Sequence, residues 1–439
     1  MTSTEEETHE EIHPQRQAIL IGLSIAVMIP GVVLRMSDFH VADPLAALLY
    51  GLAIVGAAFL LSWAAEVAQL DISAGLAIAV LAFIAVLPEY AVDLVFAMKG
   101  GNSFEGTNYT NCPAPKGAEE SPCSLALANM TGANRLLIGV GWSMVVFLAW
   151  RQWKKRGQPE RGRELQLDRT HAVELSFLGL ATAYSLFIAL RRSITIFDAV
   201  FLVALFVAYT VRISRAPAEE PHLVGPALWL GTFSTAKRRS TVIGLFVVAA
   251  GVILLCAEHF AESLVGTGAS LGVSEFLLVQ WLAPLASEAP ELLVAGLYAI
   301  RLNTNNALGT LVSSKVNQWT LLVGTLPIAF AIASSSSHGL PIDGHQREEL
   351  FLTAAQSAFA VAVLVNLSMS TREALQMFVL FVVQFIAGAV GPESIHSEVR
   401  IGTALIYLAL AARLMYRERA AIGPLIRDGF RTSYEELSK

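Results

Sequence analysis

Long apolar runs alternate with short polar connections along most of the chain. Each run is long enough for a helix that spans a membrane, which takes about 20 residues. Open strand edges cannot be left unpaired in lipid, so we interpret the runs as helices. The pattern predicts about 12 spanning helices, at residues 18–34, 45–68, 73–98, 124–150, 171–190, 194–213, 241–262, 274–300, 306–333, 350–369, 373–390 and 398–416.

The composition agrees with this pattern. Of 439 residues, 54% are hydrophobic and 15% are charged, whereas roughly 25% of the residues in an ordinary soluble protein are charged. Twelve spans leave about 200 residues for tails and loops, which excludes a large soluble domain. The net charge of −6 argues against a nucleic-acid partner.

The positions of the basic residues predict the orientation, because connections rich in Lys and Arg stay in the cytoplasm. Seven such residues lie in 151–169 and five lie in 212–240. With an even number of spans, both termini are then cytoplasmic as well. Arg191 and Arg192 fall on the outer side and do not fit the rule. We expect a multi-pass protein of the inner or plasma membrane with both termini in the cytoplasm.

Two of the three cysteines lie in the connection between the third and fourth predicted helices. Cys112 and Cys123 are 11 residues apart in a stretch rich in Pro and Gly. This connection faces outward in the predicted topology, so a disulfide is feasible in an oxidising compartment. The spacing alone leaves both the disulfide and two free thiols open.

An internal repeat is the most informative feature of the chain. Pro-Glu pairs at 88–89 and 290–291 each lie near the middle of a long apolar helix. Each of these helices is followed by one that contains Gly, Asn and Ser, at 126–141 and 307–324. Helices two to six and seven to eleven therefore form two units of five. An odd number of spans inverts the second unit relative to the first, as in many secondary transporters.

The predicted fold is an all-α polytopic membrane protein with an inverted-topology core of five plus five helices and an extra helix at each end. Its parts are a cytoplasmic tail, an extra helix with its loop, the first repeat, a cytoplasmic loop, the second repeat, and a last helix with a cytoplasmic tail. In chain order these parts cover 1–17, 18–43, 44–214, 215–240, 241–390 and 391–439.

Four acidic residues lie near the middle of the predicted membrane. Glu89 and Asp93 are four residues apart and Glu288 and Glu291 are three apart, so each pair shares one helix face. An ionisable group at that depth costs about 2.5–3.5 kcal/mol or more, so four together need a compensating partner. A cation fits, because hard ions such as Ca²⁺ bind several oxygen ligands. The alternative is that each acid pairs with a structural Arg or Lys.

Neutral ligands can come from the neighbouring residues. The proline beside each glutamate frees a backbone carbonyl oxygen, which either serves an ion or reflects only a packing kink. Polar residues on the following helices are further candidates, although close helix packing explains Ser313 equally well. They are Asn129 and Asn134 in the first repeat and Ser313, Ser314, Asn317 and Gln318 in the second.

These motifs resemble the α-repeats of the cation/Ca²⁺ exchanger superfamily, which includes sodium/calcium and calcium/proton antiporters. Residues 286–291, Ala-Ser-Glu-Ala-Pro-Glu, are similar to the family's Gly-Thr-Ser-Leu-Pro-Glu. Residues 128–134 are close to the family's helix motif, 86–89 keep the end of the first motif, and 309–315 match more loosely. The resemblance covers helices two to eleven.

The resemblance implies that Glu89 and Glu291 are the paired ligating glutamates and that Ser287 lies beside a ligating carbonyl group. The additional acids, Asp93 and Glu288, are expected to tune the charge or carry protons. The complete set of expected ion ligands is Glu89, Glu291, Asp93, Glu288, Ser287, Asn134, Ser314, Asn317 and Gln318.

The chain also departs from the family pattern. Ala85 and Val86 stand where the first repeat has Thr-Ser, and Ala133 replaces the serine of the helix motif. Half of a sodium-type ligand set is therefore missing, which favours exchange against protons. Two cations, Arg135 and Lys315, are expected to tune the charge of the site.

Lys315 replaces an asparagine of the motif and has two interpretations. Its ammonium group either fills a position that an ion occupies in relatives, or reaches toward an interface and leaves the site alone. If the four acids are counted against Lys315 and Arg135, the site carries −2 when all are ionised. One divalent ion or two protons would neutralise that charge.

We therefore expect a secondary active antiporter, and not an enzyme, that exchanges Ca²⁺ or a related cation for H⁺ or Na⁺ by alternating access. Its partners are inorganic cations and the lipid bilayer, and no cofactor is expected. The alternative is a transport-inactive relative with a structural or regulatory role, its site locked by Lys315 and Arg135. An intramembrane hydrolase is disfavoured, because no Gly-x-Gly-Asp, His-Glu-x-x-His or Gly-x-Ser-x-Gly pattern lies in a span.

Overall fold

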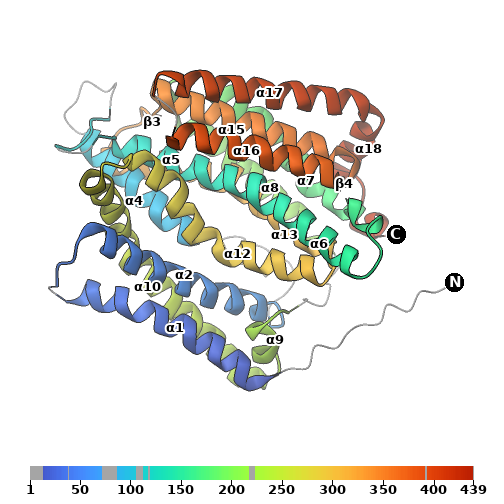
Figure 1. The fold of residues 1–439 in the computed structure, drawn as a ribbon, viewed down its shortest axis with the longest axis horizontal. Coiled ribbons are helices and arrows are strands. Elements are labelled where there is room, and N and C mark those ends of the chain that lie inside the picture. The colour runs from blue at the N-terminus through green and yellow to red at the C-terminus, as the bar shows by residue number, and fades with distance from the viewer. Residues whose placement is uncertain are drawn as a thin grey trace.

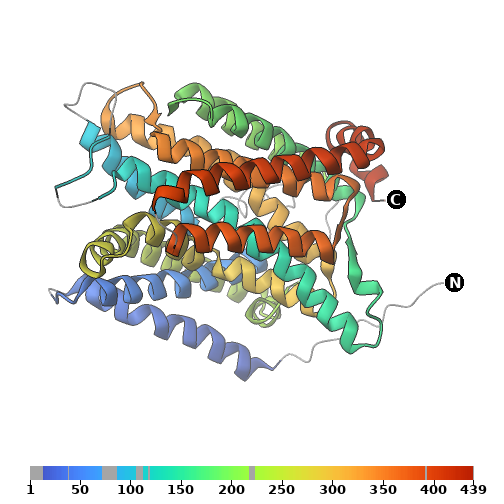
Figure 2. The ribbon, with the colours of Figure 1, turned by 45° about the horizontal axis from the view of Figure 1, so that its top comes forward.

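The computed structural model describes residues 13–37, 39–71, 87–104, 112–116, 119–216, 223–390 and 393–438. Its long helices run roughly parallel to one another (Figure 1), and they remain so in a view turned by 45° (Figure 2). Within the described residues, 10 helical segments are long and apolar enough to cross a membrane. The prediction of an all-α polytopic membrane protein is confirmed.

The first half of the chain contains eight α-helices, several shorter helical turns and two short strands within the described residues. In chain order they are α1 (Pro14–Met36), α2 (Asp43–Ala68), α4 (Leu87–Phe104), α5 (Pro122–Leu136), η1 (Leu137–Trp142), α6 (Ser143–Lys155), η2 (Arg161–Arg163), β1 (Glu164–Gln166), η3 (Arg169–His171), α7 (Ala172–Ile188), β2 (Ser193–Ile194), α8 (Ile196–Ile213) and α9 (Pro226–Gly231).

The second half continues with the long helix α10 and the second Pro-Glu helix, α12. The elements are α10 (Thr235–Leu271), α11 (Glu275–Leu277), η4 (Leu278–Leu282), α12 (Ala283–Ile300), α13 (Thr304–Asn317), η5 (Gln318–Leu322), α14 (Val323–Ser334), β3 (Leu340–Pro341), α15 (Gly344–Val363), η6 (Leu364–Asn366), β4 (Ser368–Ser370), α16 (Thr371–Val390), η7 (Glu393–Ile395), α17 (His396–Arg417), α18 (Arg419–Phe430) and α19 (Tyr434–Leu437).

The two predicted spans outside the set of 10 are those with the Pro-Glu pairs. The first, predicted at 73–98, is described only from Leu87 onward, so Ala85 and Val86 lie outside the described residues. The second, predicted at 274–300, is helical from Glu275 to Ile300 but carries three glutamates, which lower its apolar character. Both exceptions therefore coincide with the helices that bear the candidate site.

The helix that contains the span predicted at 241–262 begins earlier than predicted. α10 begins at Thr235, so the predicted loop 215–240 contains α9 and the first turns of α10. Arg238 donates two hydrogen bonds to the carboxylate of Asp71, at 2.7 and 2.8 Å. These bonds hold the pKa of Asp71 below its usual range and fix the start of α10 against the end of α2. Because Asp71 neutralises Arg238, this basic segment can form the first turns of α10.

The helices form three groups. α1, α2 and α10 pack along one edge of the bundle, and α15, α16 and α17 lie along the opposite edge, with α4, α5, α12 and α13 between them (Figure 1). α4 packs against α5 and α12, and α12 packs against α13. Helices from both repeats therefore meet in the middle of the molecule.

Two short antiparallel strand pairs join connections from the two halves. β1 pairs with β4, with Glu164 opposite Ser370, and β2 pairs with β3, with Ser193 opposite Pro341. The two pairs lie at opposite ends of the helices in Figure 1, and each joins connections that the predicted topology puts on one side of the membrane. Arg191, which did not fit the charge rule, is paired with Asp198 at 2.6 Å. Which end is cytoplasmic stays a prediction.

The feasible disulfide is formed. Cys112 and Cys123 are joined, with their Cα atoms 6.1 Å apart. Gly100 of α4 lies against the bond, because a Cβ atom there would come within 2.6 Å of the Cys123 sulfur. The disulfide therefore holds the connection after α4 close to the start of α5.

Gly132 of α5 lies against the backbone of η4, where a Cβ atom would come within 1.7 Å of the Gln280 carbonyl oxygen. We expect Gly132→Ala to destabilise the protein by about 1–3 kcal/mol, because the two backbones must move apart. Thermal unfolding in detergent should show a lower midpoint than for Gly251→Ala, whose Cβ meets nothing within 4 Å. Equal midpoints for the two variants would contradict this packing.

Candidate ion-binding site

The four predicted acidic ligands come together from two helices. Glu89 and Asp93 lie on α4, and Glu288 and Glu291 lie on α12. The side chains of Glu89, Asp93 and Glu288 are buried, at 2%, 0% and 3% exposure, whereas Glu291 is half-buried. Glu291 is therefore the most accessible of the four carboxyl groups.

Three of the acids form one cluster with two polar residues. Glu288 lies within hydrogen-bonding range of both Glu89 and Glu291. Gln318 donates from Nε2 to Glu288 Oε1 at 2.5 Å and to Glu89 Oε2 at 3.3 Å. Ser314 Oγ donates to Glu291 Oε2 at 2.6 Å. We call these five residues the glutamate cluster, and it contains side chains from both repeats.

Several oxygen atoms of the cluster point at no donor. Glu89 Oε1, Glu288 Oε2 and Gln318 Oε1 are buried and accept no hydrogen bond from the described residues. A buried polar atom without a partner is costly in a low-dielectric interior. Carboxylate and amide oxygens are, however, the ligands that a hard cation such as Ca²⁺ prefers. The oxygen atoms of the cluster are therefore of the chemical type that suits a hard cation.

Two helical turns with a wider hydrogen-bond pattern occupy the same place in the two repeats. η1 follows α5 directly, and η5 follows α13 directly. Such π-helical turns are rare and are common at functional sites. Gln318 is the first residue of η5, so this turn begins at the residue that joins the two glutamates. The sequence pattern did not reveal these turns.

Asp93 lies beside the cluster and is held by a residue of the first repeat. Its Oδ1 accepts a hydrogen bond from Asn129 Nδ2 at 2.8 Å, which joins α4 to α5. Its Oδ2 is buried and has no hydrogen-bond partner among the described residues. Its charge acts on Glu89, one turn earlier on the same helix. Asp93 is thus placed to influence the charge of the cluster.

Asn134 and Lys315 contact each other next to the cluster. Lys315 Nζ donates to the backbone carbonyl oxygen of Asn134 at 3.1 Å and also to its side-chain oxygen. The Lys315 side chain is fully buried, and its Nζ lies 4.7 Å from the centre of the Trp319 ring. Lys315 therefore does not reach toward a membrane interface.

Ser287 and Asn317 are the remaining predicted ligands. The Ser287 hydroxyl group donates to backbone carbonyl oxygens of its own helix, those of Ala283 at 3.3 Å and Pro284 at 3.2 Å. Asn317 is buried at the end of α13, directly before η5. Their role as ion ligands stays a prediction. α12 continues as helix through Pro290.

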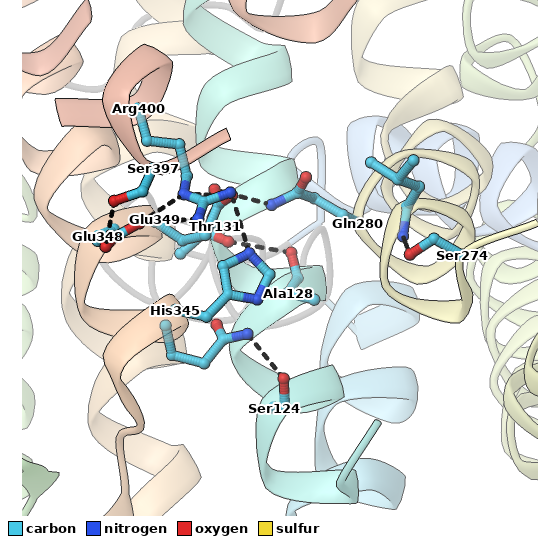
Figure 3. Close-up of polar contacts among 12 residues, drawn as sticks. Ser124, Ala128, Thr131, Ser274, Gln280, His345, Glu348, Glu349, Ser397 and Arg400 are labelled. Carbon is cyan, nitrogen blue, oxygen red and sulfur yellow. Dashed lines mark hydrogen bonds and ion pairs between the residues drawn. The ribbon is translucent and has the colours of Figure 1, made fainter. Parts of the chain in front are cut away.

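Arg135 belongs to a different group of residues. It pairs with Glu349 of α15 at 2.5 Å and lies over the Trp281 ring, 4.9 Å from its centre. Gln280 also donates to Glu349, at 3.1 Å. Figure 3 shows Glu349 between Gln280 and Arg400, with His345 close by. This group, Arg135 with Glu349, Gln280 and Arg400, lines a cavity of about 590 Å³.

Sequence reasoning missed Glu349, because the predicted span began at residue 350. A signal was present, since His345 and Glu349 are four residues apart and share a helix face. The pairing removes Arg135 from the charge balance of the glutamate cluster, because Glu349 already neutralises it.

The hydrogen bond from Ser314 orients the half-buried glutamate. We expect Ser314→Ala to lower the apparent Ca²⁺ affinity about tenfold, since a hydrogen bond to a charged group contributes about 1.5–3 kcal/mol. Thr310→Ala, one turn earlier on α13, is the control because its hydroxyl group bonds to the backbone of its own helix. Calcium titration of both variants checks this, and equal affinities would show that Glu291 needs no such support.

The fold and the buried carboxylates between two repeats define a class, the membrane exchangers of small cations. The family model of the sodium/calcium exchanger protein matches residues 44–214 and 241–388. The chain belongs to this family, and the resemblance inferred from the motifs is confirmed.

Solved structures give the same result. The chain is similar to the H⁺/Ca²⁺ exchanger CAX, with 38% sequence identity over 96% of this chain and 98% of that chain and a TM-score of 0.84. It shares its fold with the Ca²⁺/H⁺ antiporter YfkE, with 14% identity over 84% of this chain and 99% of that chain and a TM-score of 0.58. No match was found among curated protein sequences.

Proposed function

We propose that the chain is an antiporter that exchanges Ca²⁺ for H⁺ at the glutamate cluster. The observation that carries the proposal is the convergence of Glu89, Glu288 and Glu291, from two repeats, around oxygen atoms without donors. The relative with 38% identity is the H⁺/Ca²⁺ exchanger CAX, which supports the same pair of ions. The helices that hold the site come from both repeats, as alternating access requires.

The charges near the cluster favour protons as the counter-ion. Among the described residues, Lys315 is the cation whose charge acts on Glu89 and Glu288, whereas Arg135 is paired with Glu349. We therefore count the four acids, Glu89, Asp93, Glu288 and Glu291, against Lys315 alone. The site then carries −3 when all these groups are ionised, and a bound Ca²⁺ leaves one negative charge for a proton to neutralise. The neutral Ca²⁺ form then holds one proton and the neutral ion-free form holds three, so we expect about two H⁺ to move for each Ca²⁺.

The transport-inactive alternative gains no support from this geometry. Arg135 was one of the two cations expected to lock the site, and it is bound to Glu349 instead. The glutamate cluster itself contains buried oxygen atoms that accept no hydrogen bond from the described residues.

Gradient-driven uptake in proteoliposomes tests the proposal. Purified protein is reconstituted with an internal Ca²⁺ indicator, and uptake is driven by an outward H⁺ gradient or by an outward Na⁺ gradient. We expect the H⁺ gradient to drive uptake in choline salts and the Na⁺ gradient to be ineffective once the pH is clamped by a protonophore. Uptake that requires Na⁺ would contradict the choice of counter-ion.

A further inference from the structure

We propose that Lys315 is a built-in cation that fills a second ion position beside the glutamate cluster, so that the transported cation is confined to the cluster. The inference rests on the proposed function for the nature of the transported ion. It concerns a different group of atoms, the two oxygens of Asn134, and can be tested without measuring transport.

The internal repeat identifies the position. Residues 128–134 and 309–315 are the corresponding helix motifs of the two repeats, and their last residues are Asn134 and Lys315. In the structure these two equivalent residues contact each other, because Lys315 Nζ donates to both the backbone and the side-chain oxygen of Asn134. The second repeat therefore supplies a positive charge where the first supplies oxygen ligands.

The surroundings of the ammonium group are those of a bound cation. Two uncharged oxygen atoms and the face of the Trp319 ring lie around Nζ, and the side chain is fully buried. Within the described residues, no carboxylate lies at ion-pair distance from Nζ. The charges of Glu89 and Glu288 act on it at longer range. A structural lysine would be expected to pair directly with an acid, because a buried unpaired charge is costly.

This arrangement has a consequence for selectivity. Carbonyl and amide oxygens are ligands for Na⁺ and Ca²⁺ as well as for an ammonium group. While Lys315 occupies the Asn134 oxygens, a second metal ion meets both an occupied position and a repelling charge. Removing the ammonium group should open that position to a small monovalent cation.

Thermal unfolding of Lys315→Gln tests the inference. The midpoint is measured in detergent, without Ca²⁺, in NaCl and in choline chloride of equal concentration. We expect Na⁺ to raise the midpoint of Lys315→Gln by at least about 3 °C, because an ion that binds only the folded state stabilises it. The wild type should show no difference between the salts. Lys99→Gln is the control, because Lys99 pairs with Glu262 in a half-exposed contact.

Further variants keep the test informative if Lys315→Gln does not fold. Lys315→Gln combined with Glu288→Gln removes one charge of each sign and should still gain a Na⁺ effect, whereas Lys315→Arg keeps the charge and should not. In the wild type, Na⁺ and choline should change the apparent Ca²⁺ affinity equally. A Na⁺-specific loss of Ca²⁺ affinity in the wild type, or equal midpoints in both salts for folded Lys315→Gln, would overturn the inference.

The two proposals fail in different ways. If the wild type takes up no Ca²⁺ under an H⁺ gradient, the proposed function is wrong, and the Na⁺ effect on Lys315→Gln still decides the role of Lys315. If uptake occurs but Na⁺ does not stabilise Lys315→Gln, the proposed function is retained and the role of Lys315 as a built-in cation is rejected.

Discussion

Replacing Glu89 or Glu291 by glutamine is expected to abolish exchange, with Ca²⁺ flux at least about 100-fold lower, which corresponds to about 2.7 kcal/mol. Each glutamate comes from a different repeat, and both lie at the same cluster. Glutamine keeps the size of the side chain but removes its negative charge and its ability to release a proton. The cluster then has one negative charge fewer for binding a divalent cation and one proton fewer to exchange for it.

Matched variants separate this effect from misfolding. Glu262→Gln is the control, because Glu262 is half-exposed and pairs with Lys99 outside the cluster. All three variants should elute as single species and unfold at similar temperatures. If Glu89→Gln or Glu291→Gln kept wild-type flux, the two-glutamate site would be wrong.

Glu349→Gln is expected to destabilise the protein by about 3–5 kcal/mol, because it leaves the buried guanidinium group of Arg135 without its counter-charge. The Arg135–Glu349 pair is buried on both sides, with 3% and 5% exposure of the two side chains. It joins α5 of the first repeat to α15 of the second, so its loss should loosen the contact between the repeats. Thermal unfolding in detergent measures the effect.

The neighbouring residue supplies the comparison. Glu348 pairs with Arg400 at 2.7 Å, and its side chain is 26% exposed, so Glu348→Gln should cost much less, on the order of 1 kcal/mol. A double variant that replaces Arg135 and Glu349 with Met and Leu should recover most of the loss, since an apolar pair avoids the unpaired charge. Equal destabilisation by Glu348→Gln and Glu349→Gln would contradict the importance of the buried pair.

The architecture could be predicted from the sequence because the membrane imposes strong rules. Apolar runs of about 20 residues can only be helices in lipid, and the repeated Pro-Glu pairs marked the two helices that meet at the site. Four acids at spacings of three and four residues had to share helix faces. The start of α10 was less predictable, because the pairing of Arg238 with Asp71 joins residues far apart in sequence.

The partners of individual side chains could not be predicted in the same way. Arg135 was assigned to the candidate site by its place next to Asn134, but successive residues on a helix point in different directions. Arg135 turns to Glu349, whereas Asn134 meets Lys315. Gln318 was expected as a ligand, yet its position between Glu89 and Glu288 depends on helix packing that no local pattern contains.

Proton release on Ca²⁺ binding tests the central claim most directly, because it measures whether both ions use the same carboxyl groups. Ca²⁺ is added to purified protein in weakly buffered detergent solution without Na⁺, and the protons released are counted with a pH indicator. We expect about two protons per bound Ca²⁺ in the wild type and no saturable release in Glu291→Gln. Saturable Ca²⁺ binding without proton release in the wild type would contradict exchange of Ca²⁺ for H⁺ at the glutamate cluster.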